Sequence, residues 1–243
     1  MLNKETNEQT LVLIKPDAMK NSLTGYILSQ LSEYHTGLRY AATKIVNVSQ
    51  MLAEEHYAEH KGKAFFPSLL EYISGALHYP DSDWKRRTIA FVFFGKDAIQ
   101  VIRNICGPTN PHEARDTKPG CIRALGTVVP IKDTAGNLIG NRMDNLIHAS
   151  ANKADAEREI KLWFKPSDIP PRLHIFDTMI SDEHYYYKDG KLSNQYIKGS
   201  ICLVAPGDLV WKTDLEALSN HIQNKPSEIP INSVAAKYMI HLS

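Results

Sequence analysis

The chain has 243 residues, of which 43% are hydrophobic and 23% are charged, the balance of an ordinary globular protein with a full hydrophobic core. Its 28 Lys and Arg residues stand against 27 Asp and Glu residues, so the net charge is only +1. A protein that coats a polyanion such as nucleic acid needs a strong basic field, and this composition therefore argues against that class.

The first sixty residues alternate apolar and amphipathic stretches. Residues 10–15 form an apolar run that stops at Pro16 and predict a strand buried on both faces. After Thr24, apolar residues at helical spacing predict an amphipathic helix. Residues 38–48 predict a second strand, and Ser49 is a typical N-cap for a helix that runs to about residue 60.

The middle of the chain continues this alternation. Residues 65–75 predict a short helix that ends at a glycine, and the apolar run at residues 88–95 predicts a strand. Ile99, Ile102 and Ile105 then lie at helical spacing and predict a helix that ends before a Gly-Pro pair.

A stretch rich in Gly, Pro, Asn and Asp covers residues 107–143 and predicts a long functional loop with one hairpin. Residues 145–150 predict a short strand, and residues 153–164 predict an amphipathic helix. The elements follow the order β-α-β-β-α-β. We therefore predict an α+β, ferredoxin-like sandwich with helices on one side of an antiparallel sheet.

Three prolines within residues 165–171 predict a boundary between residues 1–166 and a C-terminal extension at 167–243. The extension reads as a small α+β unit, with strands that include a pair joined at a turn near Asp189. Thr213 and Glu216 suggest a capping box that opens a helix, and Ser233 suggests the cap of a final helix. No role for the extension follows from its sequence.

The cysteines and the N-terminus bear on the compartment. Cys106, Cys121 and Cys202 lack CxxC spacing, so we expect neither a disulfide framework nor a zinc site. The first residues are polar, and no apolar run approaches the roughly 20 residues of a membrane span. We therefore expect a cytoplasmic protein.

Three cations and one hydroxyl are candidates for binding phosphate. Lys15 ends the first predicted strand, where a lysine can meet a phosphate as a point charge, although a solvated strand-end lysine is the commoner case. Arg103, Thr109 and Arg123 bracket the Gly- and Pro-rich loop and can form a polyphosphate clamp. Surface ion pairs are the alternative for these arginines.

Aromatic and apolar side chains near the second predicted helix are candidates for a nucleobase site. Tyr57, Phe65 and Leu69 lie there, and an aromatic face can stack on any base. Packing in the core is the commoner role of such residues.

His148 in the segment N-L-I-H-A-S is a candidate nucleophile, with Glu159 eleven residues later on the predicted helix. A neutral imidazole is a good nucleophile at cytosolic pH, and a carboxylate on its other nitrogen fixes the tautomer. By itself, one of ten histidines is more often structural.

Five segments together are more specific than any one of them. TLVLIKPDAMKNSLTGYI, EEHYAEHKGKAFFPSLLEYISG, VIRNICGPTNP, KPGCIR and NLIHASANKADAEREIKLWF closely resemble nucleoside diphosphate kinases. They occur in the family's order over about residues 10–166. The element N-x-x-H-[GA]-S followed by R-E-I-x-L-W-F is highly specific, whereas I-K-P-D or T-N-P alone is weak.

The resemblance implies a role for each matching residue. His148 matches the phosphorylated histidine, Glu159 the acid that orients it, and Ser150 the hydroxyl beside it. Tyr57 matches the tyrosine next to the histidine. The residues that match those holding the phosphates and sugar, or flanking the base, are Lys15, Arg103, Thr109, Arg123, Asn145, Phe65 and Leu69.

The same resemblance implies a ping-pong transfer of the γ-phosphoryl group from a nucleoside triphosphate such as ATP, through the histidine, to a nucleoside diphosphate. Mg²⁺ is held largely by the nucleotide phosphates, so no metal-binding side chain is expected. No membrane partner is expected, and a nucleic-acid partner is not favoured.

This chain departs from the family pattern in several places. Ala151 stands where the family has an acidic residue, which removes a charge near the site and near the start of a helix. The loop between Arg123 and Asn145 is longer than usual, and such loops contribute to larger assemblies in relatives. We therefore expect a homo-oligomer that is at least a dimer.

Two other readings compete with an active kinase. One is a regulatory module on the same fold that binds nucleotides with weak or no turnover. The other is an RNA-binding sheet, which the near-zero charge and the lack of paired aromatics on central strands argue against. Asn145 and His148 also lie three residues apart, so both can face one site only if the strand between them bends.

Overall fold

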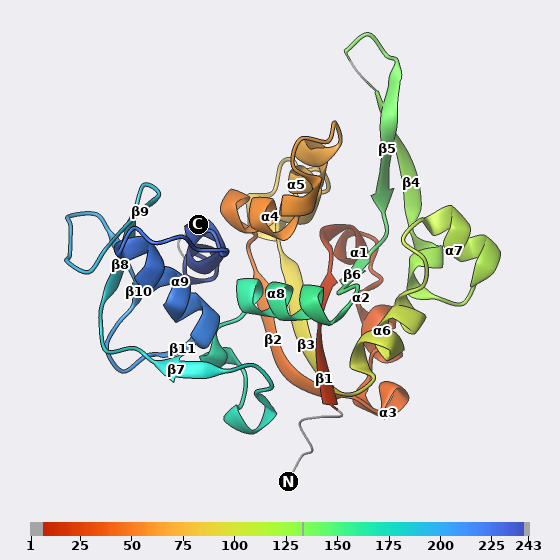
Figure 1. Cartoon of the computed structure of the whole chain (residues 1–243). Coiled ribbons are helices and arrows are strands. Elements are labelled where there is room, and N and C mark those ends of the chain that lie inside the picture. Colours follow the sequence, from red (N-terminus) through yellow and green to blue (C-terminus); the bar gives the residue numbers. More distant parts are fainter. Residues whose placement is uncertain (1–6, 133, 241–243) are drawn as a thin grey trace.

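The computed structural model describes residues 7–132 and 134–240 (Figure 1). Its centre is a four-stranded antiparallel sheet in the order β2-β3-β1-β6. The strands are β1 (Asn7–Ile14), β2 (Arg39–Val46), β3 (Thr88–Lys96) and β6 (Ile147–Ala149). This order places the first and third strands in the middle and confirms the ferredoxin-like α+β class.

The central strand β1 is buried on both faces, as its apolar run predicts. Leu11 and Leu13 belong to one hydrophobic cluster, and Val12 and Ile14 belong to another on the opposite face. Since no polar side chain interrupts Leu11 to Ile14, neither face of this strand is suited to water.

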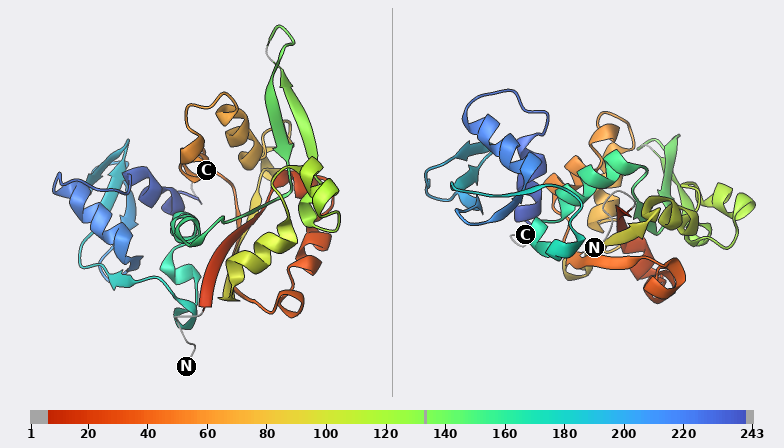
Figure 2. Two further views of the ribbon diagram at one scale, coloured as in Figure 1. Left: turned by 45° about the vertical axis from the view of Figure 1, so that its right-hand side comes forward. Right: turned by 60° about the horizontal axis from the view of Figure 1, so that its bottom comes forward.

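Helices therefore cover both faces of the sheet, and the prediction that they lie on one side is wrong (Figure 2). On one face, Leu52, Ile73 and Ile160 bring helices α4, α5 and α8 into the core. On the other, Ile27 and Ile102 bring α2 and α6. The bounds are α2 (Thr24–Gln30), α4 (Gln50–His56), α5 (Phe66–Ser74), α6 (Ala98–Cys106) and α8 (Lys153–Trp163).

The helices predicted after Thr24 and after Ser49 are both short: α2 ends at Gln30 and α4 ends at His56. A short α1 (Pro16–Lys20) precedes α2, and α3 (Glu33–Thr36) begins anew after Ser32, whose side chain accepts from His35 N. Ser49 caps α4 as predicted, by accepting from Leu52 N at 3.2 Å. A separate 3₁₀ turn at Ala58–His60 follows α4.

The predicted loop at 107–143 contains the expected hairpin and one helix that we did not predict. The hairpin consists of β4 (Thr127–Lys132) and β5 (Leu138–Asp144) and projects away from the body of the molecule (Figure 1). The helix is α7 (Pro111–Thr117). Asn110 caps it by accepting from His112 N, and proline occupies the first turn, so its start signal was present in the sequence.

Two 3₁₀ turns follow α8: Pro166–Asp168, which spans the predicted boundary, and Pro171–Leu173. The predicted turn joins β8 to β9, and β10 pairs on the other side of β8. The remaining sheet pairs β7 with β11. The bounds are β7 (Thr178–Ile180), β8 (Tyr185–Lys188), β9 (Lys191–Ser193), β10 (Ile201–Val204), β11 (Leu209–Trp211), α9 (Lys212–Ile222) and α10 (Ile231–Ala235).

Both predicted helix caps in the extension are wrong. Helix α9 begins at Lys212, so Thr213 lies within it, and the Thr213 hydroxyl accepts from Lys161 Nζ at 3.1 Å. Ser233 lies within α10 and donates to the carboxylate of Glu55 on α4. In both cases the hydroxyl bonds to a side chain of residues 1–166 rather than to its own helix.

The extension shares the core on the α8 side of the sheet. Trp211, Ala236 and Ile240 belong to the same hydrophobic cluster as Leu11 and Trp163. A second cluster around Val204, Val210 and Leu218 is the extension's own core. Among the described residues, no helix has the length and apolar character to cross a membrane.

Candidate active site

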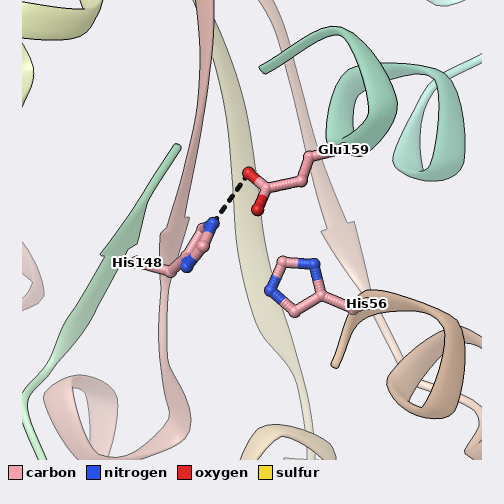
Figure 3. Close-up of side chains that lie close together, drawn as sticks. All are labelled: His56, His148 and Glu159. Atoms are coloured by element: carbon pink, nitrogen blue, oxygen red, sulfur yellow. Dashed lines mark hydrogen bonds and ion pairs between the residues drawn. The ribbon is translucent and has the colours of Figure 1, made fainter. Parts of the chain in front are cut away.

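His148 lies on β6 opposite Leu13 of β1, and its side chain meets Glu159 from α8 (Figure 3). His148 Nε2 and Glu159 Oε2 are 2.8 Å apart. Ser150 Oγ donates to the same carboxylate oxygen at 2.7 Å and accepts from Leu11 N at 3.1 Å. The three residues that the sequence singled out are therefore brought together, on a carboxylate fixed by two hydrogen bonds.

The ionised state of Glu159 decides which nitrogen of His148 is basic. Burial alone raises the pKa of this carboxyl, but His148, its hydrogen bond, His56 and Ser150 together lower the pKa to about 2. An ionised carboxylate only accepts hydrogen bonds, so Nε2 of a neutral His148 carries the proton. Nδ1 then keeps its lone pair and is the ring nitrogen that can act as a nucleophile.

A bend between β5 and β6 brings Asn145 and His148 to the same cavity. Leu146 has a φ of 68°, and Ile147 N donates back to Asn145 O at 2.7 Å. Asp17 Oδ2 stabilises this conformation by accepting from Leu146 N at 2.9 Å and from the Tyr72 hydroxyl at 2.8 Å. The irregular backbone that the three-residue spacing requires is present.

Lys15 follows β1 and is 94% buried, since only 6% of it is exposed. Its Nζ donates to Asn145 Oδ1 at 2.6 Å and lies 4.9 Å from the centre of the Tyr72 ring. Burial lowers the pKa of Lys15 to about 8, an effect that Arg123 adds to and Asp17 opposes. The lysine is thus a buried cation held at the end of the central strand.

The two arginines differ in how firmly they are held. Arg123 is buried and donates through Nη1 to Gly107 O at 2.9 Å and through Nη2 to Ile147 O at 3.2 Å. Burial lowers the pKa of this guanidinium, which stays charged at neutral pH. Arg103 and Thr109 are exposed, and Thr109 O accepts from Asn145 Nδ2 at 2.9 Å.

These groups surround a cavity of about 390 Å³. That volume lies within the range of small-ligand sites. Ten of the eleven predicted site residues line it, all except Ser150, which lies behind Glu159. They are Lys15, Tyr57, Phe65, Leu69, Arg103, Thr109, Arg123, Asn145, His148 and Glu159. The cavity therefore joins an imidazole, several cations and an apolar end.

The apolar end of the cavity is formed by Phe65 and Leu69, at the start of α5. Phe65 is 38% exposed, so part of its ring remains open to the cavity or to solvent. Tyr57 ends α4 and is 8% exposed, and burial raises the pKa of its hydroxyl, which stays protonated.

Several residues of the cavity were missed in the sequence. His56 is buried beside His148, and Arg142 reaches the cavity from the hairpin. Arg142 Nε and Nη2 donate to both oxygens of Asp144, at 2.6 and 3.0 Å. His56 precedes Tyr57 at the end of a helix and gave no local signal. Arg142 lines the cavity because β5 leads directly into the bend at Asn145, and sequence spacing does not reveal this.

The start of α8 is intact despite Ala151. Asn152 accepts from Asp155 N at 2.9 Å as the helix N-cap, and Asp155 is an acidic residue in the first turn. Ala151 is exposed and lines the cavity, together with Asp155. An acidic residue thus remains near the helix start, one turn after the position where Ala151 removes it.

His56, His148 and Glu159 are the one group of three potential metal ligands among the described residues. Trp163 Nε1 donates to His56 Nδ1 at 3.2 Å. If His56 bound a metal through Nε2 as a neutral ligand, its Nδ1 would carry the proton and face another donor. The group therefore does not suit a resident metal ion.

Comparisons with known proteins agree with this geometry. The family described as "Nucleoside diphosphate kinase" matches residues 8–169. The nucleoside diphosphate kinase of Thermococcus kodakarensis is 34% identical over 196 residues, 81% of this chain and 95% of the relative. That of Pyrococcus furiosus is 40% identical over 162 residues, 67% of this chain and 86% of the relative.

Solved structures give the same result. The Aquifex aeolicus nucleoside diphosphate kinase has a TM-score of 0.53 and 32% identity, and covers 68% of this chain and 99% of its own. A transition-state mimic of the Borrelia burgdorferi enzyme, with bound vanadate and ADP, has a TM-score of 0.52 and 31% identity, with 68% and 92% covered.

Proposed function

The chain belongs to the nucleoside diphosphate kinase family of phosphotransferases, and on this premise we propose that it transfers a γ-phosphoryl group between nucleotides through a phosphohistidine at His148. The observation that carries the proposal is the nucleophilic Nδ1 of His148 in a cavity lined by Lys15 and Arg123. A regulatory module that only binds nucleotides has no need of such a nucleophile.

In the first half-reaction, the Nδ1 lone pair attacks the γ-phosphorus of a nucleoside triphosphate. An N–P bond forms, the bond to the β,γ-bridging oxygen breaks, and a nucleoside diphosphate leaves. In the second, a terminal β-phosphate oxygen of another nucleoside diphosphate attacks the same phosphorus and the N–P bond breaks. Throughout, Glu159 keeps the Nε2 proton in place and offsets positive charge on the ring.

The side chains around His148 have distinct proposed roles. Phosphoryl transfer depends mainly on positioning and on stabilising negative charge, which Lys15, Arg103 and Arg123 supply. Thr109 and Asn145 hold the phosphates and sugar. Phe65 and Leu69 flank the base, whose π face is common to all nucleotides, so ATP and other nucleoside tri- and diphosphates are substrates.

Two further residues and a divalent cation complete the proposed machinery. Ser150 fixes the carboxylate of Glu159, and the protonated hydroxyl of Tyr57 donates to the transferred group. The family works with a divalent cation. We propose Mg²⁺, which prefers oxygen ligands and enters as part of the magnesium–nucleotide substrate.

The assembly and compartment are also proposals. We infer a homo-oligomer that is at least a dimer and a cytoplasmic protein. The edge strand β2 supports an assembly, since Ile45 on it is 61% exposed. Light scattering of the purified chain measures the assembly, and a monomer at micromolar concentration would contradict this proposal.

The deciding experiment uses [γ-³²P]ATP and Mg²⁺. Wild type is expected to take up label that is labile to acid and stable to base, and to release it to added GDP. His148→Ala is expected to take up none.

The matched control is His174→Ala, which removes a histidine that is buried in the extension, away from the cavity. It should label as wild type does. A folded wild type that binds ATP without taking up label would favour the regulatory module instead.

A further inference from the structure

His56 is the buried neighbour of His148 in the cavity. It is the last residue of α4 and only 2% exposed. Its ring lies perpendicular to that of His148, with centroids 4.6 Å apart and an interplanar angle of 77°. On its other side, the ring of Trp163 lies 5.5 Å away at 87°. His56 is thus held between the proposed nucleophile and a core tryptophan.

Trp163 determines the tautomer of His56. An indole N–H is only a donor, and it donates to His56 Nδ1 at 3.2 Å, so Nδ1 must accept. Burial and the nearby His148 place the pKa of His56 well below its usual range, with Arg158 and Lys15 acting in the same direction and Glu159 opposing. His56 is therefore neutral at physiological pH, and its single proton is on Nε2.

The Nε2–H group points toward His148. Figure 3 shows this nitrogen on the side of the His56 ring that faces the His148 ring. In residues 7–132 and 134–240, no hydrogen-bond acceptor pairs with it, and it is sealed from solvent. A buried donor without an acceptor is unfavourable, and such groups are uncommon in folded proteins. The His148 ring, with its centroid 4.6 Å from that of His56, is the group that this edge of His56 faces.

We propose that His56 is a positioning residue for His148: Trp163 locks the direction of the His56 ring, and the His56 N–H edge rests against the His148 imidazole and fixes its tilt. This inference rests on the proposed role of His148 as the phosphate carrier. His56 touches neither nucleotide nor phosphorus in this role.

The tilt of His148 matters because its Nδ1 lone pair lies in the plane of the ring. Glu159 holds the His148 ring at Nε2 alone. One hydrogen bond leaves the ring plane free to rotate about the axis from Nε2 to the backbone attachment. A perpendicular ring against one face prevents that motion and keeps the lone pair directed at the incoming phosphorus. Misdirection of a reacting group by about 1 Å costs on the order of 100-fold in rate.

The charge state of His56 suits this role. A positively charged ring beside His148 would repel the positive charge that develops on His148 as the N–P bond forms. His56 avoids this because it stays neutral, while its N–H still offers a fixed edge. Metal binding at the same nitrogen is opposed by the indole N–H, as described above.

The test measures the rate of phosphohistidine formation by rapid quench with [γ-³²P]ATP. His56→Phe keeps an aromatic ring but removes the N–H and the acceptor for Trp163. We expect the rate to fall about 10- to 100-fold with KM for ATP unchanged. His56→Gln can accept from Trp163 and still direct an N–H toward His148, so it should restore most of the lost rate.

Two further variants separate positioning from general damage. Trp163→Phe removes the indole donor together with part of a buried ring. It should slow labelling in the same direction as His56→Phe. His174→Gln is the matched control, since His174 is also buried and its ring lies 5.8 Å from that of Trp211. It should leave the labelling rate unchanged.

Nitrogen-15 NMR of the imidazoles provides a readout that does not depend on activity. The signal lost in His56→Gln should report a neutral Nε2–H tautomer between pH 6 and 8, and Trp163→Phe should allow the other tautomer. A His56 that titrates in this range would overturn the inference.

The kinetic outcomes are also decisive. Wild-type labelling at the same rate in His56→Phe would overturn the inference while leaving the proposed function intact. Equal losses in His56→Gln and His56→Phe would assign His56 a packing role only. Absence of label in wild type would instead reject the kinase function itself, and the inference with it.

Discussion

Lys15 is a cation whose charge depends on its burial, and this sets a limit on the working pH. Its pKa is about 8, whereas Tyr57 and Cys106 in the same region have raised pKa values and stay protonated there. Loss of the Lys15 charge removes one of the three cations that we propose to bind the phosphates.

We therefore expect kcat/KM for a nucleoside triphosphate to fall as pH rises through about 8, because kcat/KM reports the free enzyme. In Lys15→Arg this fall of kcat/KM should disappear, since a guanidinium does not titrate in that range. A pH–rate series from 6 to 9.5 measures both proteins. An identical fall of kcat/KM in Lys15→Arg would show that another group titrates near pH 8.

The effect of Lys15 on stability has the opposite sign to its effect on activity as the pH rises. The folded pKa of Lys15 lies below its usual value of 10.5, so between about 8 and 10.5 the unfolded chain binds more protons. The contribution of Lys15 to the free energy of unfolding therefore rises with pH in that window. If activity near pH 8 is lost together with the folded structure, the cause is therefore not the deprotonation of Lys15.

At the scale of elements, the bend between β5 and β6 depends on a short network. Asp17 Oδ2 accepts from Leu146 N and from the Tyr72 hydroxyl, and Asn145 N donates to that hydroxyl at 3.1 Å. All of these groups are buried. A non-glycine residue with positive φ, Leu146, persists here because its neighbours fix it.

Tyr72→Phe removes the hydroxyl at the centre of this network. We expect the free energy of unfolding to fall by about 1–3 kcal/mol, because Asn145 N–H and Asp17 lose a buried partner. The KM for nucleotides should rise as Asn145 shifts. Urea unfolding and steady-state kinetics measure the two effects.

Tyr187→Phe is the matched control for this change. Its hydroxyl donates to Asn232 Oδ1 at 3.0 Å in the extension, and that bond is only partly buried. It should cost less stability and leave KM unchanged. If Tyr72→Phe left both quantities as in wild type, the bend would not depend on Asp17 and Tyr72.

At the scale of the whole molecule, we propose that the extension acts as a brace for the two helices behind the site. Ser233 on α10 donates to Glu55, the residue before His56 on α4, and Lys161 on α8 donates to Thr213 on α9. Trp211 is fully buried in the core shared with α8, and its Nε1 donates to Phe164 O at 2.8 Å.

Trp211→Ala tests the brace in the full chain. We expect a loss of about 3–5 kcal/mol of stability, the usual cost of removing a large buried aromatic side chain. Far-UV circular dichroism and residual activity should be lost in one urea transition, because the two parts share a core.

The control for this variant is Trp84→Ala, since Trp84 is 73% exposed and should contribute little. Two separate transitions in wild type, with activity lost at only one of them, would show that the extension folds independently of the rest.

The sequence alone determined the strands, the fold class and most of the cavity. Those signals are local: an apolar run such as residues 10–15 indicates a buried strand, and Ser49 indicates the start of a helix. The pairing of His148 with Glu159 was also predicted, through resemblance to a family rather than through spacing.

The coverage of both sheet faces, the packing of the extension and the place of His56 beside His148 are visible only in the folded chain. Thr213 and Ser233 look like helix caps because a hydroxyl near a helix start usually bonds locally, but each found a partner across the interface. Contacts between segments far apart in sequence leave no periodicity to read. They arise from packing, and packing is set by the whole chain at once.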